Sequence, residues 1–198
     1  HAQDAARDPP PPGTIRDLDY GDVLFHFFQD DYFDALVRLE VSRDLNRIEH
    51  HSAEAELLSG GLYLSLGLHA EASRIFNRLL AGPVPQSVSD RAHFYLARIG
   101  YQRGYHAEAW RSLERIRAPL PGALESERRL LASNVLMAQG RFSEAVGALQ
   151  HASDDDWAPY ARFNLGVAMV RSGAAEEGKR LLESVGTMAA ESDEERSL

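Results

Sequence analysis

The sequence of 198 residues contains no cysteine. This absence excludes disulfide bonds, zinc sites built from thiolates and catalysis by a thiol. No apolar run approaches the roughly 20 residues that a membrane-spanning helix needs. Basic residues are also scarce, because 21 Lys and Arg stand against 30 Asp and Glu, for a formal net charge of −9. This balance argues against a surface for nucleic acid or anionic lipid, which would need a basic patch.

Motifs of enzyme chemistry are missing as well. The sequence has no G-x-S-x-G motif, no phosphate-binding loop and no dinucleotide fingerprint. The histidines form no His-x-x-x-His pair, and the adjacent His50 and His51 would point about 100° apart on a helix. The acidic groups at Asp30-Asp31 and Asp154–Asp156 fall at expected turns and helix starts, where carboxylates are solvated rather than tuned for catalysis. We therefore expect a non-enzymatic protein with no catalytic residue, no metal ligand and no cofactor.

What the sequence does contain is a recurring motif. Residues 139–149 read QGRFSEAVGAL, residues 103–113 read RGYHAEAWRSL, and related copies of the motif occur at 66–76 and 172–182. Their glycines are 37, 36 and 33 residues apart, at Gly67, Gly104, Gly140 and Gly173. Self-similarity at a period of about 20–50 residues is the signature of a solenoid.

Each copy of the motif has a structural interpretation. The glycine is expected to end one amphipathic helix, where a positive φ is needed and a side chain would clash. A small residue, Ala109 or Ala145, then lies where the next helix crosses the first. The aliphatic residue four positions later, Leu113 or Leu149, is expected to fill the seam beside it. The motif thus predicts a pair of closely packed helices.

These units resemble tetratricopeptide repeats (TPRs), helix–turn–helix modules of about 34 residues. The resemblance covers about residues 17–185 and implies an all-α, right-handed TPR-type α-solenoid of about five repeats. In the family's frame, Phe142 falls at position 17, Ala72, Ala109 and Ala145 at position 20, Phe76 at position 24, Leu165 and Gly166 at positions 7 and 8, and Pro121 at position 32.

The ends of the chain differ from the repeats. Residues 1–16 contain four consecutive prolines without apolar periodicity and predict an extended tether. A start of this kind without Met is typical of a protein after export, so we expect a periplasmic or otherwise exported protein, with a cytoplasmic location as the alternative. Residues 186–198 are expected to be an acidic tail or the start of a further repeat, because Ser192–Glu195 has a capping-box pattern.

Five repeats are expected in the folded part. In the first, Asp30-Asp31 breaks the helix where later copies use Gly, and a second helix of the fifth is expected over about 175–185. Ser87 and Ser89 are N-cap candidates for the first helix of the third repeat. The repeats span about 17–48, 53–84, 90–121, 126–156 and 159–185.

The resemblance also implies a concave groove, lined by positions 2, 5, 9, 12 and 13 of each repeat. Phe94, Arg98 and Tyr101 follow i, i+4, i+7 spacing and share one helical face. Aromatic and Arg side chains most often carry binding energy. The alternative for Phe94 and Phe163 is that they pack as ordinary core. The candidate partner-binding residues are Arg91, Phe94, Arg98, Tyr101, Asn134, Tyr160, Phe163 and Arg171.

We therefore expect a scaffold that binds a partner protein or peptide in its groove, with no nucleic-acid partner and no direct membrane span. The alternative is a module of an envelope polysaccharide-export or assembly apparatus that contacts glycan or outer-membrane partners. Tyr101 and Tyr160 suit the stacking of sugars as well as the anchoring of a peptide, so they do not separate the two. The sequence leaves the oligomeric state open.

Overall fold

The computed structural model describes the backbone of residues 14–149 and 158–196, and the side chains of residues 14–149 and 160–186. Within these residues the chain forms ten α-helices and no strand. It divides into two compact units at the junction of Ala81 and Gly82. The predicted tether up to Gly13 and the acidic run Asp154–Asp156 lie outside the described residues.

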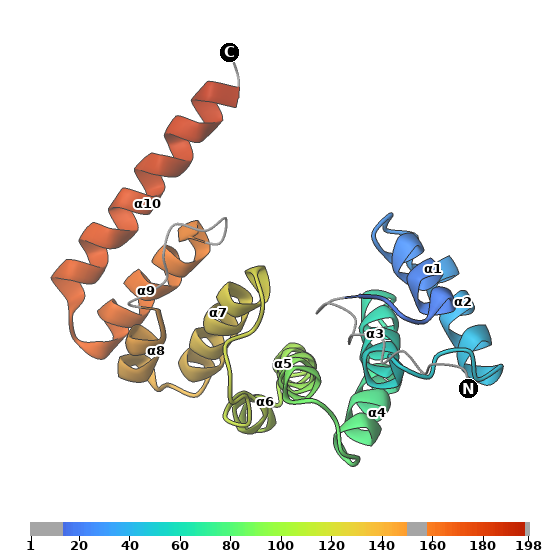
Figure 1. Ribbon diagram of the computed structural model, residues 1–198. Coiled ribbons are helices and arrows are strands. Elements are labelled where there is room, and N and C mark those ends of the chain that lie inside the picture. The colour runs from blue at the N-terminus through green and yellow to red at the C-terminus, as the bar shows by residue number, and fades with distance from the viewer. Residues whose placement is uncertain (1–13, 150–157, 197–198) are drawn as a thin grey trace, which may run out of the picture. The chain divides into compact units, whose positions relative to one another are not determined.

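Every odd-numbered helix packs against the even-numbered helix that follows it (Figure 1). This pairing confirms the predicted all-α helix–turn–helix architecture. The first unit holds α1 (Leu18–Phe27), α2 (Tyr32–Asp44), α3 (Ser52–Ser65) and α4 (His69–Leu80). The second unit holds α5 (Gln86–Gln102), α6 (His106–Leu113), α7 (Ala123–Ala138), α8 (Phe142–Leu149), α9 (Ala158–Ser172) and α10 (Ala175–Arg196).

In the second unit, the first helices of successive pairs form a row. Helix α7 packs against both α5 and α9, in addition to its own partner α8 (Figure 1). The core between α5, α6 and α7 contains Phe94, Leu113 and Val135, all buried. The row of odd-numbered helices is the element that positions the candidate site.

One backbone geometry recurs at the turn inside the helix pairs. In the third pair, the N–H of Tyr105 donates to the carbonyl of Gly100 at 2.8 Å, five residues earlier. This is the bond of a Schellman motif, which places a left-handed residue just after the helix. The repeat glycines adopt the φ values that the motif requires, 76° at Gly67, 79° at Gly104, 75° at Gly140 and 107° at Gly173.

The first pair makes the same turn without glycine. Asp30 has a φ of 59°, and the N–H of Asp31 donates to the carbonyl of His26 at 3.1 Å. Asp is one of the few residues with a side chain that tolerates this region. The prediction that Asp30 replaces the repeat glycine is therefore confirmed.

Small residues allow the paired helices to touch. A methyl group added at Gly100 would lie 3.4 Å from both Cβ and the backbone nitrogen of Ala109, which is van der Waals contact, so the backbones of α5 and α6 approach closely at Ala109. At the crossing of α9 and α10, a methyl group at Gly178 would lie 2.7 Å from the carbonyl oxygen of Gly166. Ala109 and Ala145 are both buried. The structure thus places Ala109 in the close contact that the repeat pattern predicts.

Buried carboxylates hold the loops that join successive pairs. Asp17 is 7% exposed, and its Oδ2 accepts hydrogen bonds from the backbone N–H groups of His50 and His51, each at 2.9 Å. Burial raises the pKa of Asp17, but the hydrogen bonds from the His50 ring and from these N–H groups outweigh it and lower the pKa. Asp17 therefore fixes the loop that leads into α3.

Two acidic residues do the same before α7. Asp90 is buried in α5 and accepts hydrogen bonds from the N–H groups of Arg117 at 3.0 Å and Ala118 at 3.3 Å. Glu125 accepts one from the N–H of Leu120 at 3.0 Å. Burial raises the pKa of Glu125, but hydrogen bonds from Arg128 and Leu120 lower it by more. The resulting pKa is about 2.

Two predictions about helix ends are wrong. Helix α5 begins at Gln86 after Pro85, so Ser87 and Ser89 lie inside its first turn and do not cap it. Helix α10 continues to Arg196, so Ser192–Glu195 does not open a new helix and α10 does not end near residue 185. The physical reason is that no Gly or Pro follows Gly186, whereas the Ala and Glu residues there favour helix.

Replacement of Ala109 by Leu should force α5 and α6 apart. We expect a loss of roughly 1–3 kcal/mol in the free energy of unfolding, the usual range for overpacking. Ala145→Leu, at the equivalent buried position in α8, should behave alike. Ala107→Leu is the matched control, because Ala107 is exposed on the same helix as Ala109. Urea unfolding measures all three, and equal stability of the Ala109 and Ala107 variants would contradict the close contact.

Replacement of Glu125 by Gln should destabilise the protein by roughly 1–3 kcal/mol near neutral pH, because the charged acceptor for the half-buried Arg128 and Arg129 guanidinium groups is lost. The folded-state pKa of about 2 lies below the ordinary value of 4.5, so the stabilisation is complete above about pH 4.5 and is lost as the pH falls towards 2. Urea unfolding of both proteins across this range provides the test. A stability difference that stays constant as the pH falls would show that the Glu125 charge is not responsible.

Candidate functional site

A pocket of about 210 Å³ opens between α5 and α7, the first helices of two successive pairs. It contains four of the eight residues predicted from the sequence: Phe94, Arg98, Tyr101 and Asn134. Its other lining residues are Gln102, Glu127, Leu130 and Leu131.

The floor of the pocket belongs to the core. Phe94 is 1% exposed and packs with Leu131 and Ala97, so it is a core residue, the alternative that the sequence left open. Tyr101 is half-buried, and its ring centroid lies 5.6 Å from that of His106. Leu130 is half-buried on the opposite helix. The pocket therefore offers apolar walls to a ligand.

The polar groups of the pocket lie on the facing sides of α5 and α7. Nη1 of Arg98 lies 3.7 Å from Oε2 of Glu127, and these side chains are 46% and 27% exposed. An ion pair this exposed contributes at most about 1 kcal/mol, so it is readily exchanged for contacts with a ligand. Arg98 and Glu127 thus supply one positive and one negative group at the same opening.

A side-chain bond connects the pocket to α9. Nδ2 of Asn164 donates to Oδ1 of Asn134 at 2.7 Å. This bond fixes the Asn134 amide in the orientation in which its own Nδ2 can donate to a ligand carbonyl. Asn164 was not among the predicted residues. Its sequence signal is an Asn on the expected first helix of the next repeat, 30 residues after Asn134.

The other four predicted residues lie outside the pocket. Nε of Arg91 donates to the carbonyl of Ser87 in its own helix at 3.3 Å. The Arg171 guanidinium lies 4.9 Å from the centroid of the Phe142 ring. On α9, Tyr160 is 64% exposed and Phe163 is 52% exposed. Phe163 is therefore not a core residue, in contrast to Phe94.

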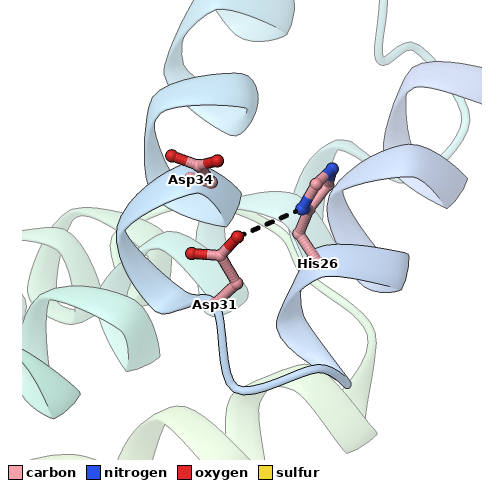
Figure 2. Close-up of side chains that lie close together, drawn as sticks. All are labelled: His26, Asp31 and Asp34. Carbon is pink, nitrogen blue, oxygen red and sulfur yellow. Dashed lines mark ion pairs between the residues drawn. The ribbon is translucent and has the colours of Figure 1, made fainter.

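A separate cluster of ligand-type side chains lies at the first turn of the chain. Among the described residues, His26, Asp31 and Asp34 form the one such set, with their ligand atoms within 4.8 Å of one another. Figure 2 shows His26 at the end of α1 facing Asp31, with Asp34 in the first turn of α2. Nδ1 of His26 lies 3.5 Å from Oδ2 of Asp31. Both carboxylates are exposed, and the contact between His26 and Asp31 spans the turn between α1 and α2.

No family model matches the sequence. No curated protein matches it either.

The fold, in contrast, is similar to solved structures. The structure of the MamA RS-1 ArsTM double mutant has a TM-score of 0.68 at 18% identity, over 89% of this chain and 96% of that one. The TPR-like repeats of a putative kinesin light chain from Podosopora anserina have a TM-score of 0.63 at 17% identity, over 89% and 95%. YrrB, a TPR protein with an unusual peptide-binding site, has a TM-score of 0.64 at 18% identity, over 84% and 82%.

These similarities confirm the TPR fold that the repeat pattern predicts. At such low identity they show the fold alone. In the described part of the chain, no helix combines the length and the apolar character needed to cross a membrane.

Proposed function

We propose that this chain, which has the tetratricopeptide-repeat fold, is a protein–protein interaction scaffold that holds an extended segment of a partner across α5 and α7. The observation that carries the proposal is the pocket in which Arg98, Tyr101 and Asn134 meet on the row of first helices. YrrB, which has the same fold, is described as having a peptide-binding site. The proposal assigns the same kind of use to this chain.

The pocket indicates what the segment presents. Its volume of about 210 Å³ and its Tyr101 and Leu130 walls suit one apolar side chain. Burial of such a side chain contributes roughly 1.5–3 kcal/mol. Beside it, an acidic group of the partner can take the place of Glu127 at Arg98. The favoured segment thus combines an apolar residue with a nearby acidic one.

Amide groups and exposed aromatics extend the surface towards α9. The Asn134 amide, held by Asn164, suits a backbone carbonyl of an extended peptide. Tyr160 and Phe163 lie on α9, which packs against α7, and both expose more than half of their surface. Large exposed aromatics of this kind are enriched at binding hot spots. They provide further anchor points for a segment that crosses the row of first helices.

Peptide binding is proposed over glycan binding for one reason. Tyr101 is half-buried with its ring near His106, and its neighbours in the pocket are Leu130 and Asn134, which suit a side chain and a peptide backbone. The polysaccharide-export alternative has no comparable observation in the described residues. Export of the protein stays a prediction of the sequence.

The test uses a displayed library of random peptides selected on the wild-type protein. Affinities of the selected peptides are then measured for the Arg98→Ala/Tyr101→Ala double variant. We expect a loss of at least about tenfold, because truncation of hot-spot residues costs more than about 1 kcal/mol each. The matched control is Arg111→Ala/Tyr105→Ala, which removes an exposed Arg and an exposed Tyr of the same repeat outside the pocket.

The controls decide the interpretation. Selected peptides should retain their affinity for the Arg111→Ala/Tyr105→Ala variant. Equal affinity for wild type and the Arg98→Ala/Tyr101→Ala variant, with both proteins folded by circular dichroism, would remove this pocket as the binding site.

A further inference from the structure

A second pocket, of about 460 Å³, lies at the other end of α5 and shares no residue with the first. It is formed by the start of α5 and by the residues that follow α6. Its lining residues are Gln86, Ser89, His93, Glu114, Arg115 and Arg117. Nothing in the proposed binding of a peptide between α5 and α7 uses them.

Two arginines, Arg115 and Arg117, line this pocket. Other arginines of the chain are paired with carboxylates, as Arg111 is with Glu108 at 2.9 Å and Arg38 with Asp22 at 2.8 Å. Within the described residues, neither Arg115 nor Arg117 has a carboxylate within ion-pair distance of its guanidinium. Both are exposed at the pocket. In a protein with a net charge of −9, two unneutralised guanidinium groups at one opening mark a place for an anion.

His93 supplies an independent observation. The residue is 9% exposed and is one of the pocket's lining residues, and within the described residues its buried Nδ1 has no hydrogen-bond partner. Burial and then the charge of Arg115 lower the pKa of His93, while Asp90 opposes the shift. The imidazole is therefore neutral near pH 7 and has one N–H to donate. A buried polar nitrogen without a partner is unfavourable, and a ligand oxygen would satisfy it.

The backbone of α5 adds donors at the same place. The helix has 17 residues, and its N-cap, Pro85, provides no side-chain hydrogen bond. The N–H groups of Val88 and Ser89 bond to the carbonyl of Pro85. Those of Gln86 and Ser87 belong to the first turn, where a helix has no internal acceptor for them. The partial positive charge of such a helix start favours an anion.

We infer that this pocket binds a phosphate dianion. Arg115 and Arg117 would pair with its oxygens, the Ser89 hydroxyl would donate to it, and the His93 imidazole would donate from the buried side. A phosphoryl group has three strong acceptor oxygens, more than a carboxylate, and so matches these separate donors best. The group belongs either to a phosphorylated residue of a partner or to free phosphate.

Two carboxylates limit the affinity of this site. Asp90 is committed to the loop, because it accepts from the Gln86 amide at 2.8 Å and from the N–H groups of Arg117 and Ala118. Glu114 lines the pocket and is exposed. Its charge repels a dianion. Unlike Asp90, it accepts no hydrogen bond from a loop within the described residues. Removal of the Glu114 charge should therefore strengthen binding, whereas removal of the Asp90 charge would disturb the fold.

The test is calorimetric titration of the full chain with inorganic phosphate and, separately, with a phosphoserine tripeptide and its unphosphorylated form. Arg115→Gln and Arg117→Gln should each weaken phosphate binding by about tenfold or more, since charge-assisted hydrogen bonds are the strong ones. Glu114→Gln should tighten it by about two- to tenfold. Arg111→Gln is the matched control, because it removes an equal charge from α6 outside the pocket.

Nuclear magnetic resonance of the histidine rings gives a second readout. Phosphate should shift the His93 ring signals, assigned by their absence in His93→Gln, in wild type and Arg111→Gln but not in Arg115→Gln/Arg117→Gln. Binding of the phosphotripeptide as well as phosphate supports a phosphorylated partner, whereas binding of phosphate alone supports the free ion. The proposal is overturned if neither probe binds, or if Arg115→Gln and Arg117→Gln bind as Arg111→Gln does. Either result leaves the peptide site at Arg98 and Tyr101 unaffected.

Discussion

The close approach of the two helices within each pair is the constraint on which the structure depends. Helix backbones can touch only where one side of the contact has almost no side chain. The ring of Phe76 fills the space that a side chain at Gly60 would need, and Leu182 fills the corresponding space at Gly166. In both pairs a glycine on the first helix thus faces a large residue on the second.

This contact determines where the functional groups lie. Once each first helix is fixed against its partner, the face turned away from that partner is available for ligands. In the second unit, the packing of α7 against α5 brings Arg98, Tyr101 and Asn134 into one pocket. The buried carboxylate of Asp90 holds the loop between these pairs. The same loop carries Arg117 to the pocket at the start of α5.

The sequence predicted what is periodic and missed what depends on contacts between repeats. The repeat glycines, the Asp30 turn and the small residue at Ala109 all follow from local geometry, so their spacing was sufficient. The bond between Asn164 and Asn134 and the position of His93 depend on loop conformation and on rotamers, which no spacing records. The wrong helix start at Ser192 has another cause. A capping-box pattern marks a helix start only where the residues before it do not already form a helix.

The central claim is that the small residue at the Gly60 and Gly166 positions of the first helix is matched to the large residue that faces it, and a double-mutant cycle at Gly60 and Phe76 tests it most directly. The third repeat has Ala97 and Leu113 at the equivalent positions, both buried. Gly60→Ala/Phe76→Leu therefore imports a pair that the chain already uses. Urea unfolding of the two single variants and the double variant should show a coupling energy of at least about 1 kcal/mol in favour of the double variant. Strictly additive losses would show that the two positions are not matched.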